Sequence, residues 1–358
     1  MAYLDFKGVG VTAMAAAVPK RVIKNREYTE FWSEEEAVAI VEKTGIEERR
    51  FADESTCSSD LCFAAAEQLF ADNDINKEEI DLLVFISQTP DYRMPATSVT
   101  LQHRLGLPNS TIAFDINLGC SAFLYGLSVV FGMMQTGNLR KALILDGETR
   151  SKVYSPRDRR SAFLFGDGGV AALVERDEKF GRSTFSLNSD GSRAELIMIP
   201  AGGYRKMSSA ETVVEKVVDE FGNMRSEEQG YMMGGDVFNF VIREIPRDIK
   251  KTLAYAEKTV EDFDYVVFHQ ANNFINSYIA KKMKLDTTKI PSTIAKYGNT
   301  SSVSVPLTIV SELKGKLDGP KQLLLSAFGV GMTWATGIVP FCDCKISDIV
   351  EVENGQRI

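Results

Sequence analysis

The chain has little of several features that define particular classes of protein. Only two of its 358 residues are histidine and five are cysteine, and the cysteines show no paired CxxC spacing, so the sequence predicts no metal site. A net charge of −8 argues against a nucleic-acid-binding protein, because such proteins usually carry a basic face. No apolar run approaches the length that a bilayer requires, so we expect no membrane insertion.

The composition is that of an ordinary globular protein. Apolar residues make up 44% and charged residues 25% of the chain, and the length suits one large domain or two smaller ones with a well-buried core. The first stretch, MAYLDFKGVG, lacks the cationic start and long apolar segment of a signal peptide. Because an odd number of cysteines favours reduced thiols, we expect a cytoplasmic protein.

Apolar, β-rich runs alternate with amphipathic stretches along the chain, which is the pattern of parallel sheets with helical crossovers. This pattern predicts buried strands at 80–87, 141–148, 263–270 and 321–329, and helices at 58–75 and 128–137.

One series of elements occurs twice. Residues 78–127 and residues 261–310 each run strand, loop, helix, short strand, loop, helix, and an apolar strand follows each. We expect two fused α/β halves whose loop ends meet at one cleft, because ligands of open α/β sheets bind at the carboxyl ends of the strands. The expected parts are an N-terminal half (1–180), a polar, glycine-rich excursion over the cleft (181–235), a C-terminal half (236–345) and a polar tail without a core role (346–358).

Cys120 lies in a strand-to-helix loop of the first half. The stretch TIAFDINLGCSAFLYGL predicts a strand, a glycine turn and a cysteine at the start of a helix. The positive end of a helix lowers the pKa of a thiol and makes the nucleophilic thiolate available. The alternative is a buried, inert cysteine, which is the more frequent kind.

Two polar residues of the second half lie at comparable places. His269 ends the run FDYVVFHQ, where it is either a satisfied buried side chain or an acid–base group. Asn299, in KYGNTSSVSVP, occupies the loop equivalent to that of Cys120, and by itself it predicts a helix cap. The other histidine, His103, falls in a helical pattern beside Arg104 and is expected at the surface. A thiol, an imidazole and an amide at strand ends suit acyl-thioester chemistry, in which a thiolate takes the acyl group and two neutral donors hold an enolate oxygen.

The stretches around Cys120, His269 (HQANN) and Asn299 (YGNTSSVSVP), together with FGDGG (165–169) and AFGVGMTW (327–334), resemble the β-ketoacyl-acyl carrier protein synthase III family of the thiolase superfamily. The resemblance runs through nearly the whole chain and implies a thiolase-like, duplicated five-layer αβαβα fold with two pseudo-symmetric halves. It implies that Cys120, His269 and Asn299 form a catalytic triad. The implied reaction is a decarboxylative Claisen condensation, in which a primer on Cys120 joins malonyl-acyl carrier protein.

The resemblance also implies roles for residues around the triad. The backbone N–H groups of Cys120 and Val330 form an oxyanion hole, although Val330 stands where the family usually has glycine. Asp167, in FGDGG, is interpreted as fixing local hydrogen bonds within a tight turn rather than acting in catalysis.

Lys43 and Arg159 match residues that bind CoA or its pantetheine arm. The family's clamp tryptophan and arginine correspond here to Ala39 and Lys43, so the stacking face is absent and an ammonium replaces a guanidinium. The sequence therefore leaves open whether the primer donor is an acyl-CoA or an acyl-carrier thioester. We expect no bound cofactor.

Partner contacts are implied by the same resemblance. Met94 and Phe328 match acyl-pocket residues, and Met94 would reach into the partner subunit of a homodimer. Lys281 and Lys282 match residues that dock the acyl carrier protein, whereas Phe274 replaces a basic residue that usually helps there.

Two alternatives to condensation are compatible with the residues. One is an acyltransferase that passes the acyl group from Cys120 to a hydroxyl or amine without decarboxylation. The other is a non-catalytic partner subunit, against which the intact cysteine, histidine and asparagine count.

Overall fold

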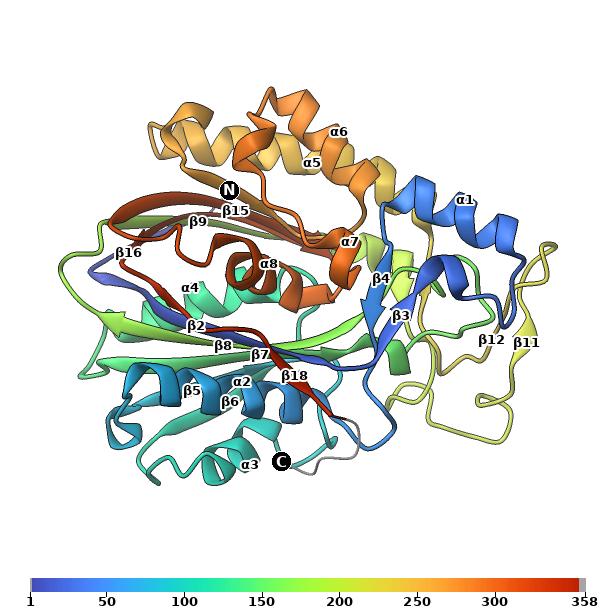
Figure 1. The fold of residues 1–358 in the computed structure, drawn as a ribbon, viewed down its shortest axis with the longest axis horizontal. Coiled ribbons are helices and arrows are strands. Elements are labelled where there is room, and N and C mark those ends of the chain that lie inside the picture. The colour runs from blue at the N-terminus through green and yellow to red at the C-terminus, as the bar shows by residue number, and fades with distance from the viewer. Residues whose placement is uncertain (1, 354–358) are drawn as a thin grey trace.

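Two sheets alternate with three layers of helices (Figure 1). The computed structural model describes residues 2–353. A seven-stranded sheet and a five-stranded sheet enclose a central pair of helices, and each sheet is covered on its outer side by two more. This is the predicted αβαβα architecture. The helices are α2 (Ser58–Asn73) and α3 (Thr97–Arg104) in one outer layer, α4 (Ala122–Met134) and α8 (Ser304–Leu313) in the centre, and α5 (Gly234–Tyr255) and α6 (Asn273–Met283) in the other outer layer.

The seven-stranded sheet has the order β17-β2-β8-β7-β5-β6, with β18 also paired to β2. β5 runs parallel to β6 and β7, whereas β8 runs antiparallel to β7 and β2. The strands are β2 (Val9–Pro19), β5 (Leu82–Ile86), β6 (Ile112–Ile116), β7 (Lys141–Thr149), β8 (Asp167–Arg176), β17 (Lys345–Ile346) and β18 (Val350–Val352).

The five-stranded sheet repeats this arrangement. Its order is β1-β9-β16-β15-β14, with β14 parallel to β15 and the other pairs antiparallel. The series β5-β7-β8-β2 therefore matches β14-β15-β16-β9 in order and direction, which confirms the repeat read from the sequence. The strands are β1 (Tyr3–Lys7), β9 (Arg182–Ser189), β14 (Tyr265–Phe268), β15 (Pro320–Gly329) and β16 (Thr333–Cys342).

Only the first copy of the repeat contains the expected short strand. β6 pairs with β5, but the corresponding segment 287–293 forms a 3-10 turn followed by irregular chain. Pro291 in that segment has no N–H to donate to a neighbouring strand, and the five-stranded sheet ends at β14.

The C-terminal segment is not the polar tail that we expected. β17 and β18 pair with β2, and Val352 is 3% exposed. Ile346 and Ile349 also pack against the core between the sheets. Polar side chains separate these apolar residues in the sequence, so the segment gave no recognisable strand pattern. Residues 354–358 of the predicted tail lie outside the described part of the chain.

The FGDGG stretch starts a strand instead of forming a tight turn. Asp167 is the first residue of β8, and a Cβ on Gly169 would lie 2.7 Å from the backbone nitrogen of Cys62 in α2. Glycine is required here because helix and strand approach closely. The Asp167 carboxylate accepts hydrogen bonds from the backbone of Ala52 and from the backbone and hydroxyl of Ser151. Its predicted role in local hydrogen bonding is confirmed.

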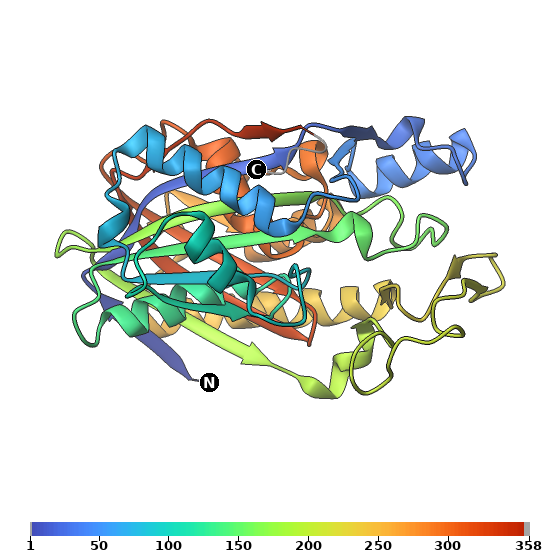
Figure 2. The ribbon, with the colours of Figure 1, turned by 90° about the horizontal axis from the view of Figure 1, so that it is seen from below.

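The remaining elements gather at one end of the molecule, together with the later part of the predicted excursion 181–235, called the connecting segment below (Figures 1 and 2). The predicted start of that segment is wrong, because residues 182–189 form β9 of the five-stranded sheet. Part of that segment forms two short hairpins, in which β10 pairs with β13 and β11 with β12. The elements are α1 (Glu34–Thr44), α7 (Ile294–Tyr297), β3 (Val22–Lys24), β4 (Glu48–Arg50), β10 (Ile197–Met198), β11 (Lys216–Val217), β12 (Met224–Arg225) and β13 (Tyr231–Met232).

Candidate active site

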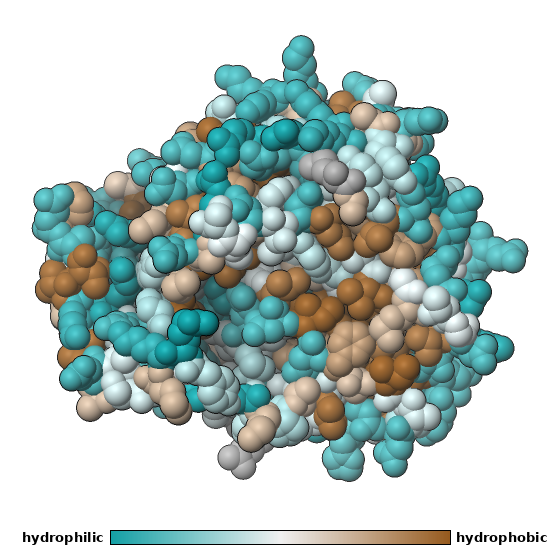
Figure 3. Space-filling view, turned by 180° about the vertical axis from the view of Figure 1, so that it is seen from behind, coloured by the Kyte–Doolittle hydropathy of each residue, from teal (hydrophilic) through white to brown (hydrophobic). Residues whose placement is uncertain are grey.

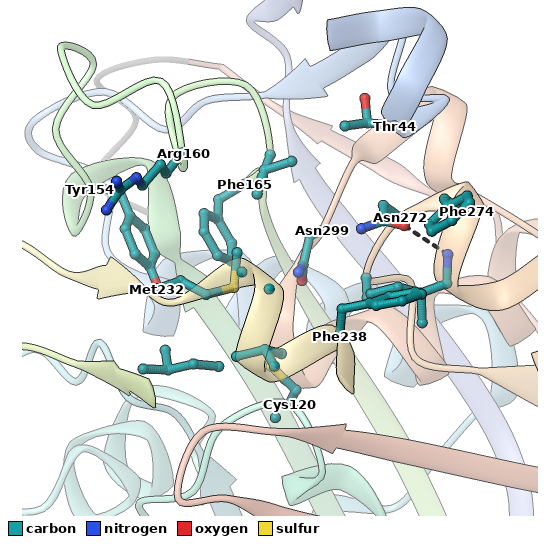
Figure 4. Close-up of a pocket in the computed structure, with 18 of the residues that line it drawn as sticks. Thr44, Cys120, Tyr154, Arg160, Phe165, Met232, Phe238, Asn272, Phe274 and Asn299 are labelled. Carbon is teal, nitrogen blue, oxygen red and sulfur yellow. Dashed lines mark hydrogen bonds between the residues drawn. The ribbon is translucent and has the colours of Figure 1, made fainter. Parts of the chain in front are cut away.

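A cavity of about 610 Å³ brings together the three residues singled out from the sequence. Cys120, His269 and Asn299 all line it, and they come from both halves of the fold. Figure 4 shows Cys120 at the floor of the cavity, with Tyr154 and Phe165 along one side. Such a volume lies within the usual range of small-molecule sites.

Cys120 follows β6 and immediately precedes the helical turn that leads into α4. Burial raises the pKa of its thiol, but the charge and hydrogen bond of His269 and the charge of Arg150 act in the opposite sense and bring the pKa down to about 7. The hydroxyl of Ser301 lies 3.8 Å from the sulfur. A thiol with a pKa near 7 is partly ionised at neutral pH, which is the state that a cysteine nucleophile requires.

His269 is fixed at the carboxyl end of β14. Its backbone N–H donates to Ser326 of the neighbouring strand at 2.8 Å, and its Nδ1 lies 2.7 Å from the hydroxyl of Ser304 at the start of α8. That hydroxyl also accepts the backbone N–H of Gln270 at 3.3 Å. Opposite the Cys120 thiolate the ring acts as the cation, with a proton on each nitrogen. In the neutral ring we assign the Ser304 hydroxyl as donor to Nδ1, so the remaining ring proton lies on Nε2. The ring thereby presents a donor at its other nitrogen.

Asn299 is held by the first half of the chain although it belongs to the second. Its backbone N–H donates to Leu164 at 2.9 Å, and its carbonyl accepts from Gly166 at 3.1 Å. Gly298 precedes it with φ +64°, and a Cβ there would lie 2.7 Å from the Leu164 carbonyl oxygen. The Asn299 side-chain oxygen accepts the backbone N–H of Ser301 at 2.9 Å. This bond resembles the cap expected from the sequence, and it leaves the Nδ2 group available as a donor.

The loop after β15 reaches the cavity directly beside Cys120. Val330 lines the cavity, and neither its backbone N–H nor that of Cys120 donates a hydrogen bond among the described residues. A Cβ on Gly329 would lie 2.5 Å from the Cys120 sulfur, and one on Gly119 would lie 2.9 Å from the Val330 side chain. The two glycines permit this close approach, and Thr333 holds the Val330 carbonyl at 2.9 Å.

The predicted CoA-binding residues lie near one another in the cavity wall. Lys43 and Arg159 both line the cavity, whereas Ala39 is exposed and does not. Arg159 is 2.7 Å from Glu36 of α1 and is half-exposed. Phe221, an exposed aromatic residue of the connecting segment, also borders the cavity.

The other predicted site residues are placed differently. Phe328 is buried and lines the cavity, but Met94 is 82% exposed and does not line the cavity of its own chain. Lys281 and Lys282 lie on α6, outside the cavity wall, and the Lys282 ammonium donates to the Ile242 carbonyl at 2.6 Å. His103 is exposed on α3, as expected.

Sequence reasoning missed two residues near the triad. Ser304 sits in a run of small polar residues in which nothing distinguishes it. Arg150 directly follows β7 and is buried in the cavity wall. The only available signal was its position after a buried strand, where site residues of α/β folds gather.

No cluster of three or more potential metal ligands occurs within residues 2–353. Over the same range, no helix has the length and apolar character needed to span a bilayer.

Comparisons with known proteins agree with this geometry. The 3-oxoacyl-[acyl-carrier-protein (ACP)] synthase III family model matches residues 114–191, and the model of that family's C-terminal part matches residues 253–341. The chain is 36% identical over 301 residues to the β-ketoacyl-[acyl-carrier-protein] synthase III of Clostridioides difficile, covering 84% of this chain and 88% of that protein. It is 33% identical over 332 residues to the synthase III of Caldanaerobacter subterraneus, covering 92% and 97%.

The crystal structure of a 3-oxoacyl-(acyl-carrier protein) synthase from Burkholderia xenovorans has a TM-score of 0.92 and 35% identity to the chain, covering 98% of this chain and 99% of the other. The sequence matches and the shared fold lead to one conclusion: the chain belongs to the β-ketoacyl-[acyl-carrier-protein] synthase III family, within the thiolase superfamily.

Proposed function

We propose that the chain forms a β-ketoacyl-acyl carrier protein by decarboxylative Claisen condensation of a primer acyl thioester with malonyl-acyl carrier protein. The observation that carries this function is the convergence of Cys120, His269 and Asn299 on one cavity. Members of this family are enzymes of this type.

Cys120 performs the first step. Its thiolate attacks the carbonyl carbon of the primer thioester, the new C–S bond forms, and the bond to the donor thiol breaks. The proton from Cys120 ends on that departing thiol. The backbone N–H groups of Cys120 and Val330 are the proposed donors to the tetrahedral oxyanion, a position for which donors already fixed in place are most effective.

His269 and Asn299 act in the second step. The malonyl C–C bond breaks, carbon dioxide leaves, and the electron pair becomes an enolate whose oxygen accepts from His269 Nε2 and Asn299 Nδ2. The carbanion then attacks the acyl carbon, a C–C bond forms, and the Cys120 thiolate is released. Each donor is expected to contribute about two to three orders of magnitude in rate.

Two measurements test this assignment. Mass spectrometry of the intact protein after mixing with acyl thioesters detects the acyl group on Cys120, and release of carbon dioxide from malonyl-acyl carrier protein reports condensation. Asn299→Ala should lower condensation by about 100-fold or more while acylation changes by less than about 10-fold. An equal loss in both steps contradicts the role of Asn299. Acylation without carbon dioxide release favours transfer to a hydroxyl or amine, and no acylation favours a non-catalytic subunit.

We further propose a homodimer built on the edge of the seven-stranded sheet. β6 is the edge strand, so one row of its backbone groups has no neighbouring strand. Apolar residues gather on the face that is hidden in Figure 1 (Figure 3), and Val99, Ile112 and Val129 of α3, β6 and α4 are exposed apolar side chains. The exposure of Met94 is compatible with insertion into a partner's cavity. Light scattering should show the wild type as a dimer and Ile112→Lys shifted toward the monomer. A monomeric wild type contradicts the proposal.

The remaining partner assignments concern the thioester donors. Lys43 and Arg159 in the cavity wall are proposed to bind the CoA or pantetheine arm. Lys281 and Lys282 are proposed to attract the acidic surface of an acyl carrier protein, and such attraction acts mainly on the rate of encounter. The cytoplasm is the proposed location, supported by five cysteines that are all free thiols.

A further inference from the structure

Arg150 is a buried cation in the wall of the catalytic cavity. It is the first residue of the short turn after β7, it is 4% exposed, and it lines the same cavity as Cys120. The charge of Arg150 helps to lower the pKa of the Cys120 thiol, but no step of the proposed condensation uses the N–H groups of its guanidinium. A buried charge is expensive unless a partner compensates it, so its surroundings decide what Arg150 can bind.

The protein satisfies the guanidinium of Arg150 only in part. Nη2 donates to the Tyr154 hydroxyl at 3.1 Å, Nη1 makes a long contact of 3.4 Å with Gln88, and Nε has no hydrogen-bond partner. A guanidinium carries five N–H groups, so most of its donor capacity is unused among the described residues. It is therefore prepared to accept a further ligand with oxygen acceptors.

Glu148 does not supply that ligand. Its carboxylate lies 3.9 Å from Arg150 Nη1, beyond hydrogen-bond distance. The same carboxylate accepts from the Gln88 backbone at 3.1 Å and from the Thr89 hydroxyl at 3.0 Å. Glu148 thus partly balances the charge of Arg150 without occupying its free N–H groups.

Two aromatic rings flank the guanidinium in the cavity wall, which also carries Lys43, Arg159 and Arg160. Tyr154 and Phe165, labelled in Figure 4, stack with ring centroids 4.0 Å apart. The Arg150 guanidinium carbon lies 5.4 and 5.7 Å from their centroids. Phe328, together with Met232, adds apolar surface to the wall. Methylene groups fit this wall, whereas a group with oxygen acceptors fits Arg150.

The wall behind the guanidinium is also cationic. Arg150, Tyr154 and Phe165 border a second cavity of about 160 Å³, whose lining includes Arg49. Arg49 is fully buried, and its Nη2 has no hydrogen-bond partner. The second cavity is therefore lined by two guanidinium groups, each with one buried nitrogen that has no hydrogen-bond partner within the described part of the chain.

We propose that the primer of this enzyme is an ω-carboxyacyl thioester, the half-thioester of a dicarboxylic acid, whose distal carboxylate binds to Arg150. Arginine binds carboxylates through two parallel N–H···O bonds, and such bonds are stronger than those between neutral groups. A primer that ends in a methyl group would exclude water from the free N–H groups without forming hydrogen bonds to them, which disfavours its binding. This inference rests on the proposed function and adds the class of primer to it.

The covalent step is unchanged by this primer. Cys120 Sγ attacks the thioester carbonyl carbon, the C–S bond to the donor thiol breaks, and the donor leaves as a thiol. The distal carboxylate stays intact and ionised, so the product on the carrier protein ends in a carboxylate. The reaction that consumes this product must therefore accept a chain with an anionic end.

The experiment compares matched pairs of primers. Succinyl- and butyryl-CoA have the same carbon chain length, as do glutaryl- and pentanoyl-CoA, and adipyl- and hexanoyl-CoA. The rate of Cys120 acylation is followed by mass spectrometry of the intact protein. In at least one pair the wild type should prefer the carboxylated member by about 100-fold or more. A preference for the neutral member in all pairs overturns the inference. If the neutral acyl groups on Cys120 then condense with malonyl-acyl carrier protein, the proposed function stands and only the class of primer is wrong.

Variants separate this role from an effect on the Cys120 thiol. Loss of the Arg150 charge from beside the Cys120 thiol should slow acylation by both members of a pair, but Arg150→Met should in addition lower the ratio of acylation by the carboxylated primer to acylation by the neutral primer about 100-fold or more. An equal loss for both primers shows that Arg150 serves the thiolate instead. A raised KM for malonyl-acyl carrier protein with unchanged primer preference shows that it holds the malonyl carboxylate. Arg160→Met is the matched control, because it removes another cation from the same cavity wall and should leave the ratio between paired primers unchanged.

Discussion

Replacing His269 with glutamine should raise the pKa of the Cys120 thiol. In the wild type, burial raises this pKa, but the charge and hydrogen bond of His269 and the charge of Arg150 lower it to about 7. Without the imidazole, the burial effect has less opposition, and we expect the pKa to exceed the usual value of about 8.5 for cysteine. The thiolate fraction at neutral pH would then fall from about one half to about 3% or less, a loss of about 2 kcal/mol in thiolate stabilisation.

The assay is alkylation of Cys120 by iodoacetamide as a function of pH, with the modified peptide identified by mass spectrometry. The midpoint of the pH profile is the readout, because a thiolate of higher pKa is also intrinsically more reactive and rates alone would understate the change. Cys57 provides an internal control: it lies outside the catalytic cavity, and its own pKa is raised by burial.

The wild-type midpoint for Cys120 should lie near 7, and the His269→Gln midpoint should move toward alkaline pH, while that of Cys57 stays constant. If both proteins titrate near 7, the start of α4 and the charge of Arg150 are sufficient to ionise the thiol. The role assigned to His269 in thiol activation would then be wrong, although its role as an enolate donor would be untouched.

Three further changes test particular contacts. Ser304→Ala removes the hydroxyl that fixes Nδ1 of His269, so carbon dioxide release should slow by about 10-fold, less than for loss of the donor itself, with acylation little affected. Gly329→Ala places a methyl group 2.5 Å from the Cys120 sulfur, so acylation should be nearly abolished while circular dichroism is unchanged; normal acylation contradicts the close approach. Burial raises the pKa of Asp167 to about 6, so the folded state binds its proton more tightly than the unfolded state. Its contribution to the free energy of unfolding should therefore fall by up to about 3 kcal/mol as pH rises from about 4 to 6. Denaturant melts of the wild type and of Asp167→Asn should show this difference shrinking over that interval, and a constant difference would contradict the shift.

The three residues of the triad could be predicted from the sequence because each follows a recognisable local pattern. His269 ends a predicted strand, and Cys120 lies in the loop between a predicted strand and a helix. Asn299 lies in a glycine-bounded turn before a helix. Ligand sites of open α/β sheets lie at the carboxyl ends of the strands. Because the two halves repeat the same series of elements, this rule places the loops of both halves at one cleft. The strands β5, β7, β14 and β15 were predicted because buried parallel strands are short continuous apolar runs, whereas the antiparallel strands β8, β9 and β16 were not predicted.

Ser304 and Arg150 could not be assigned in this way, because their roles depend on neighbours far away in the chain. Residues 299–304 contain five small polar residues and Val303. Only the fold selects Ser304 among them as the partner of His269. Arg150 reads as an ordinary charged residue in DGETRSK. Its burial arises because Tyr154 and Phe165 close over it, and no local pattern encodes that closure.

The C-terminal segment shows a limit of a different kind. Its polar composition predicts a tail, yet Ile346, Ile349 and Val352 reach apolar clusters on the two faces of the seven-stranded sheet. The five apolar and seven polar residues of 346–358, with one glycine, give no clear periodicity. The segment forms strands because the backbone of β2 pairs with β17 and β18. A pattern confined to the segment does not show that this edge of β2 is available.

The repeat explains why chemistry is shared between the halves and not confined to one. Asn299 belongs to the second half, but the backbone of Leu164 and Gly166 in the first half fixes its position. The bridge between Phe165 and Asn299 therefore connects the wall that carries Arg150 to the side chain proposed as an enolate donor. A substitution at Gly298, where a Cβ would strike Leu164, would displace both without touching the substrate, so the positioning of the site depends on the contact between the halves as much as on the triad itself.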